Sequence, residues 1–131
     1  MKRTGLLNQP ISNVIAGMGH LDMLVIADAG LPIPDGTLRI DLAVSAGVPA
    51  FLDVLNAVLG ELKVESAIIA SELEAKSAAM HANLLQVLGD TPLRDIPHDD
   101  FKATTTQGKA IIRTGEFTPY ANVILIAGVV F

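Results

Sequence analysis

Along the chain, apolar residues recur either at helical spacing or in short uninterrupted runs. Helical spacing predicts helices that begin near Asn8, Pro49, Ser77 and His98, each preceded or opened by a capping residue or a proline. The first of these helices is expected to stop at about Gly19, since glycine commonly follows a helix end. The next residue, a histidine, is then expected in a loop.

Uninterrupted apolar runs are typical of strands buried on both faces, as in a parallel sheet. These runs, with one alternating segment, predict strands at residues 23–27, 38–42, 67–70, 93–96, 110–113 and 123–130. Strands alternate with helices through most of the chain. The pattern therefore predicts one domain over residues 1–131 with a three-layer α/β fold and a mostly parallel sheet.

The composition adds an expectation about assembly. Hydrophobic residues make up 50% of the chain and charged residues 18%, against about 25% charged in a typical soluble domain. The longest apolar run, residues 123–131, is too short for a membrane span of about 20 residues. Polar residues from Asn8 to Asn13 interrupt any signal-peptide core. We therefore expect a cytoplasmic homo-oligomer that buries its apolar excess between subunits.

Several classes of function are disfavoured by what the sequence lacks. It has no cysteine, which fits a reducing compartment and removes thiolate chemistry. The net charge is −5 and no basic cluster exceeds Lys2–Arg3, so we expect no nucleic-acid partner. Glycine-rich phosphate motifs are missing, and the three histidines lie far apart. We expect no nucleotide, metal or other cofactor.

Candidate chemistry centres on Asp28, which ends the first buried run. Ligands of open α/β sheets bind beyond the carboxyl ends of the strands, and a Gly/Pro-rich loop, residues 29–34, follows this one. His20 precedes the same run and is expected to turn back toward that end, where an imidazole suits proton transfer near neutral pH. The local sequence equally allows a carboxylate that only holds a loop, and a lone loop histidine more often faces solvent than acts in catalysis.

Other polar residues admit two interpretations each. His98 and Lys102 share one face of a predicted helix, where they either contact a sugar hydroxyl or form an ordinary exposed surface, which the spacing slightly favours. Tyr120 and Asn122 precede the last strand and either bind a polyol or hold a turn. His81 lies within a predicted helix and is read as structural or solvated.

Taken together, these residues resemble the D-ribose pyranase family. The similarity is carried by Gly19-His20, the segment 28–34, Arg39-Ile40-Asp41, Gly47-Val48-Pro49 with Phe51, the segment 64–70, His98 with Phe101-Lys102, residues 113–116, Pro119-Tyr120-Ala121-Asn122 and Ala127-Gly128-Val129. The motifs occur in order over essentially the whole chain, and only residues 73–94 are weakly characteristic.

The resemblance implies a Rossmann-like subunit and a homodecamer with active sites between neighbouring subunits. It implies an isomerase of ribose catabolism that interconverts β-D-ribopyranose and β-D-ribofuranose without a cofactor and supplies furanose to a kinase. His20 would be the proton donor, and D-ribose would be bound by Asp28, His98, Lys102, Tyr120, Ala121 and Asn122. Two alternatives remain: a mutarotase for another sugar such as fucose, and a non-catalytic sugar-binding accessory of a transport system.

Overall fold

One six-stranded sheet organises the computed structural model, which describes residues 1–131. The strand order is β2-β5-β1-β6-β3-β4. The strands are β1 Met23–Ala27, β2 Arg39–Asp41, β3 Val64–Ala70, β4 Leu93–Ile96, β5 Gly108–Arg113 and β6 Val123–Ala127. β6 runs antiparallel to its neighbours β1 and β3, whereas every other adjacent pair is parallel.

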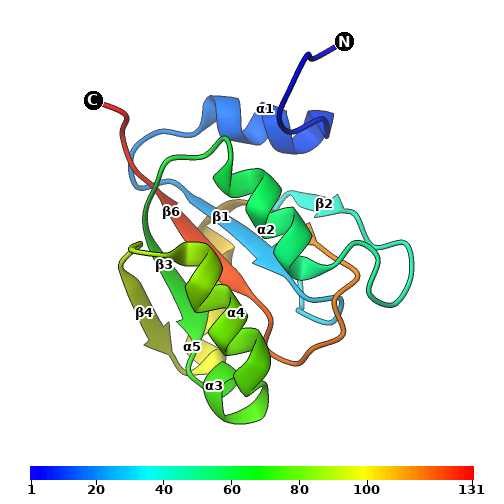
Figure 1. Cartoon of the computed structure of the whole chain (residues 1–131), viewed down its shortest axis with the longest axis vertical. Helices are drawn as coiled ribbons and strands as arrows, with labels where there is room; N and C mark the ends of the chain where they lie inside the picture. Colours follow the sequence, from blue (N-terminus) through cyan, green and yellow to red (C-terminus); the bar gives the residue numbers. More distant parts are fainter.

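Helices cover both faces of this sheet (Figure 1). They are α1 Gln9–Gly17, α2 Phe51–Leu59, α3 Glu72–Lys76, α4 Ala78–Leu88 and α5 His98–Thr104, followed by the short 3₁₀ helix η1 Thr105–Gln107. α1, α2 and α4 lie in front of the sheet in Figure 1, and α5 lies behind it. The predicted single-domain, three-layer α/β architecture with a mostly parallel sheet is confirmed.

The central strands explain why apolar runs, and not alternating ones, predicted them. In β1, Leu24 and Ile26 belong to a core of 21 buried residues on the face of α1, α2 and α4. Val25 and Ala27 belong to a smaller core of 7 buried residues on the face of α5. Both sets of side chains are buried because each face has its own helical layer.

Several element boundaries differ from the prediction. The second helix begins at Phe51 and not at Pro49, and β3 extends three residues further toward the N-terminus, to Val64. β6 ends at Ala127, because Gly128 leaves the ladder and the apolar residues that follow are exposed. Leu38 lies outside β2 and is also exposed. At the ends of β2 and β6 apolar character extended beyond the residues that pair in the sheet, whereas β3 pairs beyond its apolar run.

Helix α3 was not predicted, since five residues are too few for a periodic pattern to emerge. No helix of the structure is long and apolar enough to cross a membrane.

Because most strands are parallel, the sheet has a carboxyl edge, where these strands end, and an amino edge, where they begin. The segments that follow β1, β2, β3, β4 and β5 all start at the carboxyl edge, where β6 also begins. Helix α1 and both chain termini lie toward the opposite, amino edge (Figure 1). This division decides which candidate residues meet.

Candidate functional site

Asp28 is held at the carboxyl end of β1 by an exchange of hydrogen bonds with Asn122. The Asp28 N–H donates to Asn122 Oδ1 at 2.8 Å, and Asn122 Nδ2 donates to Asp28 Oδ2 at 3.0 Å. The Gly30 N–H donates to the other carboxylate oxygen at 2.9 Å. Asn122 is fully buried. These bonds fix the direction of a partly exposed carboxylate at the strand end.

Two aromatic rings meet at the same edge, one from the turn before β6 and one from the start of α5. Tyr120 adopts a left-handed backbone conformation, with φ of 64°, which is uncommon for a bulky residue. Its ring meets that of His98 edge-on with centroids 5.0 Å apart, and His98 in turn stacks on Phe101. His98 Nδ1 is buried and has no hydrogen-bond partner. Strained backbone and unpartnered polar atoms of this kind concentrate at functional sites.

The start of α5 is held by a residue from another element. Both carboxylate oxygens of Glu72 accept from the His98 N–H, at 3.0 and 3.1 Å. Pro97, the residue before the helix, supplies no side-chain cap. The His98 backbone bond lowers the pKa of Glu72 below its ordinary value of 4.5, because it stabilises the charged form. Glu72 therefore holds the position of His98 as an anion.

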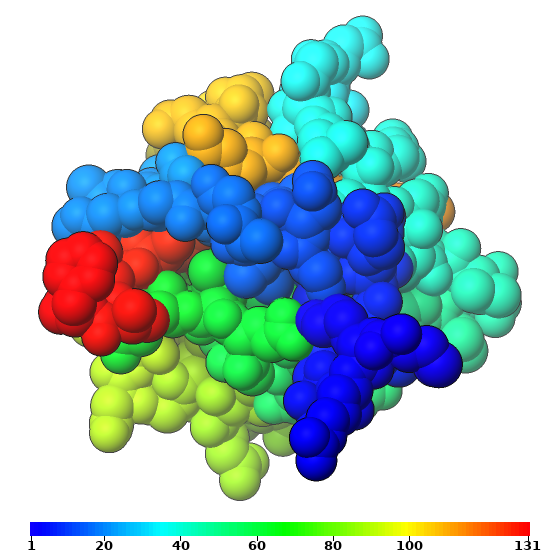
Figure 2. All heavy atoms as spheres, turned by 90° about the horizontal axis from the view of Figure 1, so that it is seen from above, coloured from blue at the N-terminus to red at the C-terminus, as the bar shows by residue number.

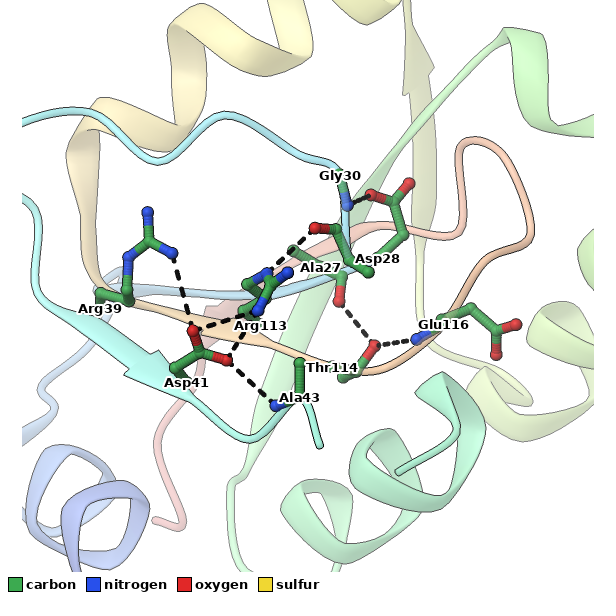
Figure 3. A network of polar contacts seen from close by, with 10 residues as sticks. Ala27, Asp28, Gly30, Arg39, Asp41, Ala43, Arg113, Thr114 and Glu116 are labelled. Carbon is green, nitrogen blue, oxygen red and sulfur yellow. Dashed lines mark hydrogen bonds and ion pairs between the residues drawn. The ribbon is translucent and has the colours of Figure 1, made fainter. Parts of the chain in front are cut away.

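A second polar network lies behind the Asp28 turn (Figure 3). Arg113 Nε donates to the Ala29 carbonyl at 3.0 Å, and Arg113 Nη1 lies 3.2 Å from both carboxylate oxygens of Asp41. Partial desolvation raises the pKa of Asp41, but bonds from the Ala43 N–H and Arg113 outweigh it, so the pKa falls below the ordinary value of 3.8. The ion pair fixes Arg113, which in turn supports the turn that carries Asp28.

A cavity of about 400 Å³ opens beside this turn. It is lined by the carboxyl ends of neighbouring strands: residues 28–30 follow β1, Arg113 is the last residue of β5, and residues 116–119 follow β5. Glu116 closes its inner part, where its carboxylate accepts from the Phe51 N–H at 3.1 Å and from the Thr118 hydroxyl at 2.9 Å. The cavity thus combines two carboxylates, a guanidinium and one hydroxyl, groups that can bind a polyol.

The predicted site residues fall into two groups. Asp28, His98, Tyr120, Ala121 and Asn122 all lie at the carboxyl edge, where a hydrogen bond joins Asp28 to Asn122 and an edge-on ring contact joins His98 to Tyr120. Ala121 is fully buried between the two polar residues of the turn.

Lys102 lies on α5, one turn beyond His98, where its ammonium pairs with Asp99 at 2.9 Å. Its hydrogen bond lowers the pKa of that exposed aspartate.

His20 lies at the opposite, amino edge. It contacts Glu65, the second residue of β3, and it lines a different cavity, of about 470 Å³, with Met18 and the C-terminal segment 127–131. The five residues of β1 separate it from Asp28 by about 16 Å or more. The expectation that the His20 loop turns back toward Asp28 is therefore wrong within one chain, because an extended strand paired on both sides keeps its two ends apart.

Sequence reasoning assigned no role to Arg113, Glu116 or Thr118. The signal that identified Asp28 applies to them as well, since Arg113 ends β5 and the other two follow it, and β5 is another buried run that ends at the carboxyl edge. No group of three or more histidine, aspartate or glutamate side chains in the structure is placed to hold a metal ion.

Comparison with known proteins identifies the family. The model of the RbsD/FucU transport protein family matches residues 1–130. D-ribose pyranases from Thermoanaerobacter sp. and Coprothermobacter proteolyticus are 54% and 52% identical, over 100% of this chain and of each relative. The structure of Bacillus subtilis RbsD complexed with D-ribose is similar with a TM-score of 0.97 at 46% identity, over 100% of both chains.

A more distant likeness concerns the fold alone. The structure of the fucose mutarotase from Streptococcus pneumoniae in complex with L-fucose gives a TM-score of 0.78 at 23% identity, over 100% of both chains. The near full-length match to the family model, together with relatives more than 50% identical, shows that this chain belongs to the RbsD/FucU transport protein family.

Proposed function

We propose that the protein is a D-ribose pyranase, an isomerase that interconverts β-D-ribopyranose and β-D-ribofuranose. The observation that carries this proposal is the cluster at the carboxyl edge, where Asp28 is fixed by Asn122 and His98 lies against Tyr120. Fixed carboxylate, amide, phenol and imidazole groups can bind the hydroxyls of a small sugar. Relatives more than 50% identical over their full length carry the name D-ribose pyranase.

The reaction requires two coupled proton transfers. The ring oxygen gains a proton as its bond to the anomeric carbon breaks, and the anomeric hydroxyl loses one to give the open aldehyde. Another hydroxyl then attacks the carbonyl and closes the other ring. We assign His20 as the acid at the ring oxygen, while Asp28, His98, Lys102, Tyr120, Ala121 and Asn122 bind the sugar. Ring opening proceeds slowly without help, so a positioned acid contributing about 10²–10⁴-fold suffices.

The separation of His20 from Asp28 supports a site built from two chains. Within one chain, the acid and the sugar-binding cluster lie at opposite edges of the sheet. An interface between the amino edge of one subunit and the carboxyl edge of the next brings them together. Such a head-to-tail interface is heterologous, and it closes into a ring when the rotation between subunits permits.

Exposed apolar side chains lie at both edges of that proposed interface. Leu21 and Val130 are exposed near His20, and exposed Phe117 lines the cavity beside Asp28, while exposed Val48 lies next to Gly115 in the loop that follows β5. Figure 2 shows the amino edge, where the C-terminal residues lie against the segment that links α1 to β1. Apolar groups at both edges favour association. We propose that the protein forms a homodecamer built from such rings. We also propose that it acts in ribose catabolism in the cytoplasm.

The proposal is tested by NMR saturation transfer between the pyranose and furanose signals of D-ribose, with and without the purified protein. We expect faster exchange with the wild type and none above background with His20→Ala, whose exposed position should leave folding unaffected. His81→Ala, a change at a histidine that lines neither the cavity beside Asp28 nor the cavity around His20, serves as the matched control.

The alternatives predict different results in the same experiment. Ribose binding without accelerated exchange would favour a binding accessory of a transport system. Accelerated exchange of L-fucose and not of D-ribose would favour a mutarotase for fucose.

A further inference from the structure

We propose that Glu65 is the positioning residue of His20: its carboxylate holds Nε2 of the imidazole and leaves Nδ1 to face the sugar. This inference rests on the proposed function, in which His20 is the acid. The two residues lie far apart in the sequence, His20 between α1 and β1 and Glu65 on β3, so only the fold brings them together.

A short charged hydrogen bond joins the two side chains. His20 Nε2 lies 2.6 Å from Glu65 Oε2. A carboxylate only accepts, so Nε2 carries the proton of this bond. Charge-assisted bonds of this length are stronger than neutral ones. The hydrogen bond made by one ring nitrogen sets the role of the other, which assigns proton transfer to Nδ1.

An irregularity in the sheet directs Glu65 toward His20. In the pairing of β3 with β6, Val64 lies opposite Ala127 and Ser66 opposite Ile126, so Glu65 is an extra residue between two paired ones. Bulges of this kind redirect a side chain and are over-represented next to active sites.

Gly128 leaves space for this bulge. A Cβ atom at that position would lie 3.1 Å from Cβ of Glu65 and 3.4 Å from its backbone nitrogen. A larger residue would therefore press on the backbone of Glu65 at the point where the strand departs from regular pairing.

The backbone next to His20 is also constrained. Leu21 adopts a left-handed conformation, with φ of 69°, which L-residues with a side chain rarely occupy. Its N–H donates to the Ala127 carbonyl at 2.8 Å, so the loop is tied to the end of β6, beside the bulge. A strained backbone persists only when the surrounding structure holds it. The orientation of the His20 imidazole is therefore fixed by the neighbouring backbone as well as by Glu65.

These features make His20 and Glu65 one unit at the amino edge. Each side chain is about half exposed, at 49%, in the single chain. In the proposed assembly the unit enters the neighbouring subunit's site as a whole, with the acid already oriented. Orientation before binding raises the rate of the chemical step, whereas binding itself depends on the cluster around Asp28.

The test compares Glu65→Gln and Glu65→Ala with the wild type, with Glu74→Gln as a control at an exposed glutamate of α3. Exchange is measured by NMR saturation transfer over a range of ribose concentrations. We expect kcat of Glu65→Ala to fall about tenfold or more, part of the factor that a positioned acid contributes, with KM within about twofold of the wild-type value. Glu65→Gln should fall less, because its amide oxygen can still accept from Nε2.

A spectroscopic measurement separates positioning from folding. In ¹⁵N-labelled protein, the ring nitrogen signals of His20 should shift in both Glu65 variants, whereas those of His81 should not. Unchanged kcat in Glu65→Ala would overturn the inference, and so would unchanged His20 signals. If His20→Ala also retained wild-type exchange, the proposed function would fail with it; if His20→Ala were inactive, only the role of Glu65 would be lost.

Discussion

At the scale of single residues, Asn122 is the most specifically constrained group of the candidate site. Its amide accepts from the backbone of Asp28 and donates to the carboxylate of the same residue. Only a side chain with both a donor and an acceptor in this geometry can bond to the N–H and the carboxylate of Asp28 at the same time. Asn122 is fully buried, so a lost partner cannot be replaced by bulk water.

We therefore expect Asn122→Asp to weaken both folding and ribose binding. The substitution keeps the size and the acceptor but replaces the donor by an oxygen that faces the Asp28 carboxylate. The free energy of unfolding should fall by about 1–3 kcal/mol, the range for an unsatisfied buried polar group. Urea unfolding and ribose titration calorimetry at pH 7 measure the two effects. Asn83→Asp, at an exposed position of α4, is the matched control, and equal stability of the two variants would contradict the prediction.

At the scale of elements, two helices of the site begin at caps supplied by distant glutamates. Glu72 accepts from the first residue of α5, and Glu116 accepts from the first residue of α2. Neither helix has a side-chain cap of its own. Both glutamates lie at the carboxyl edge, so the contacts that start these helices also hold the loops of the candidate site.

The cap of α5 predicts a defined loss of stability in acid. The pKa of Glu72 is lowered in the folded protein, chiefly by the bond from the His98 N–H. Its contribution is therefore complete above the ordinary value of 4.5 and is lost as the pH falls through the lower folded value. Glu72→Gln should lower the melting temperature at pH 7, and the difference from wild type should shrink below pH 4.5. Melting curves between pH 3 and pH 7 measure this, with Glu74→Gln expected to follow the wild type.

A close approach of two loops predicts that Gly115 accepts no side chain. A Cβ atom there would lie 2.6 Å from the Ser45 carbonyl oxygen and would also collide with the backbone of Val48. Gly115→Ala should reduce the free energy of unfolding by about 1–3 kcal/mol, as other overpacked sites do. Gly17→Ala, where nothing lies within 4 Å, should be neutral or slightly stabilising. Chemical denaturation measures the free energy of unfolding of both variants. Wild-type stability of Gly115→Ala would show that these loops can move apart.

At the scale of the whole molecule, the sheet separates the proposed acid from the proposed sugar-binding cluster. His20 lies before β1 and Asp28 follows it, so the length of the strand lies between them. In the mechanism proposed above a complete site would require two chains, and the exposed apolar residues at both edges would provide a reason for them to associate.

Complementation between inactive variants tests this arrangement. Homogeneous His20→Ala and Asp28→Ala proteins should each lack catalysed exchange. Co-expressed in equal amounts, they should recover about one quarter of the wild-type exchange, since in a random ring about one interface in four pairs an intact His20 with an intact Asp28. Saturation transfer on the purified mixed assembly measures the recovery. No recovery would mean that both residues act within one chain.

The sequence by itself determined every strand, four of the five α-helices, and the residues at one edge of the candidate site. The apolar run of β1 and the cap at Asn8, which accepts from the Ile11 N–H at 3.0 Å, were recognisable because they depend on neighbours in the chain. Asp28 was identifiable for the same reason, as a polar residue that ends a buried run. The α/β architecture followed from the alternation of such elements.

Only the tertiary structure decided which residues meet. The strand order, the antiparallel insertion of β6, and the contacts of Asn122 with Asp28 and of Glu65 with His20 all join positions distant in the sequence. It also placed His20 away from Asp28, against the expectation from their closeness in the chain. Periodicity reports the environment of each element, whereas long-range contacts depend on how all elements pack at once, and that is settled only by the complete fold.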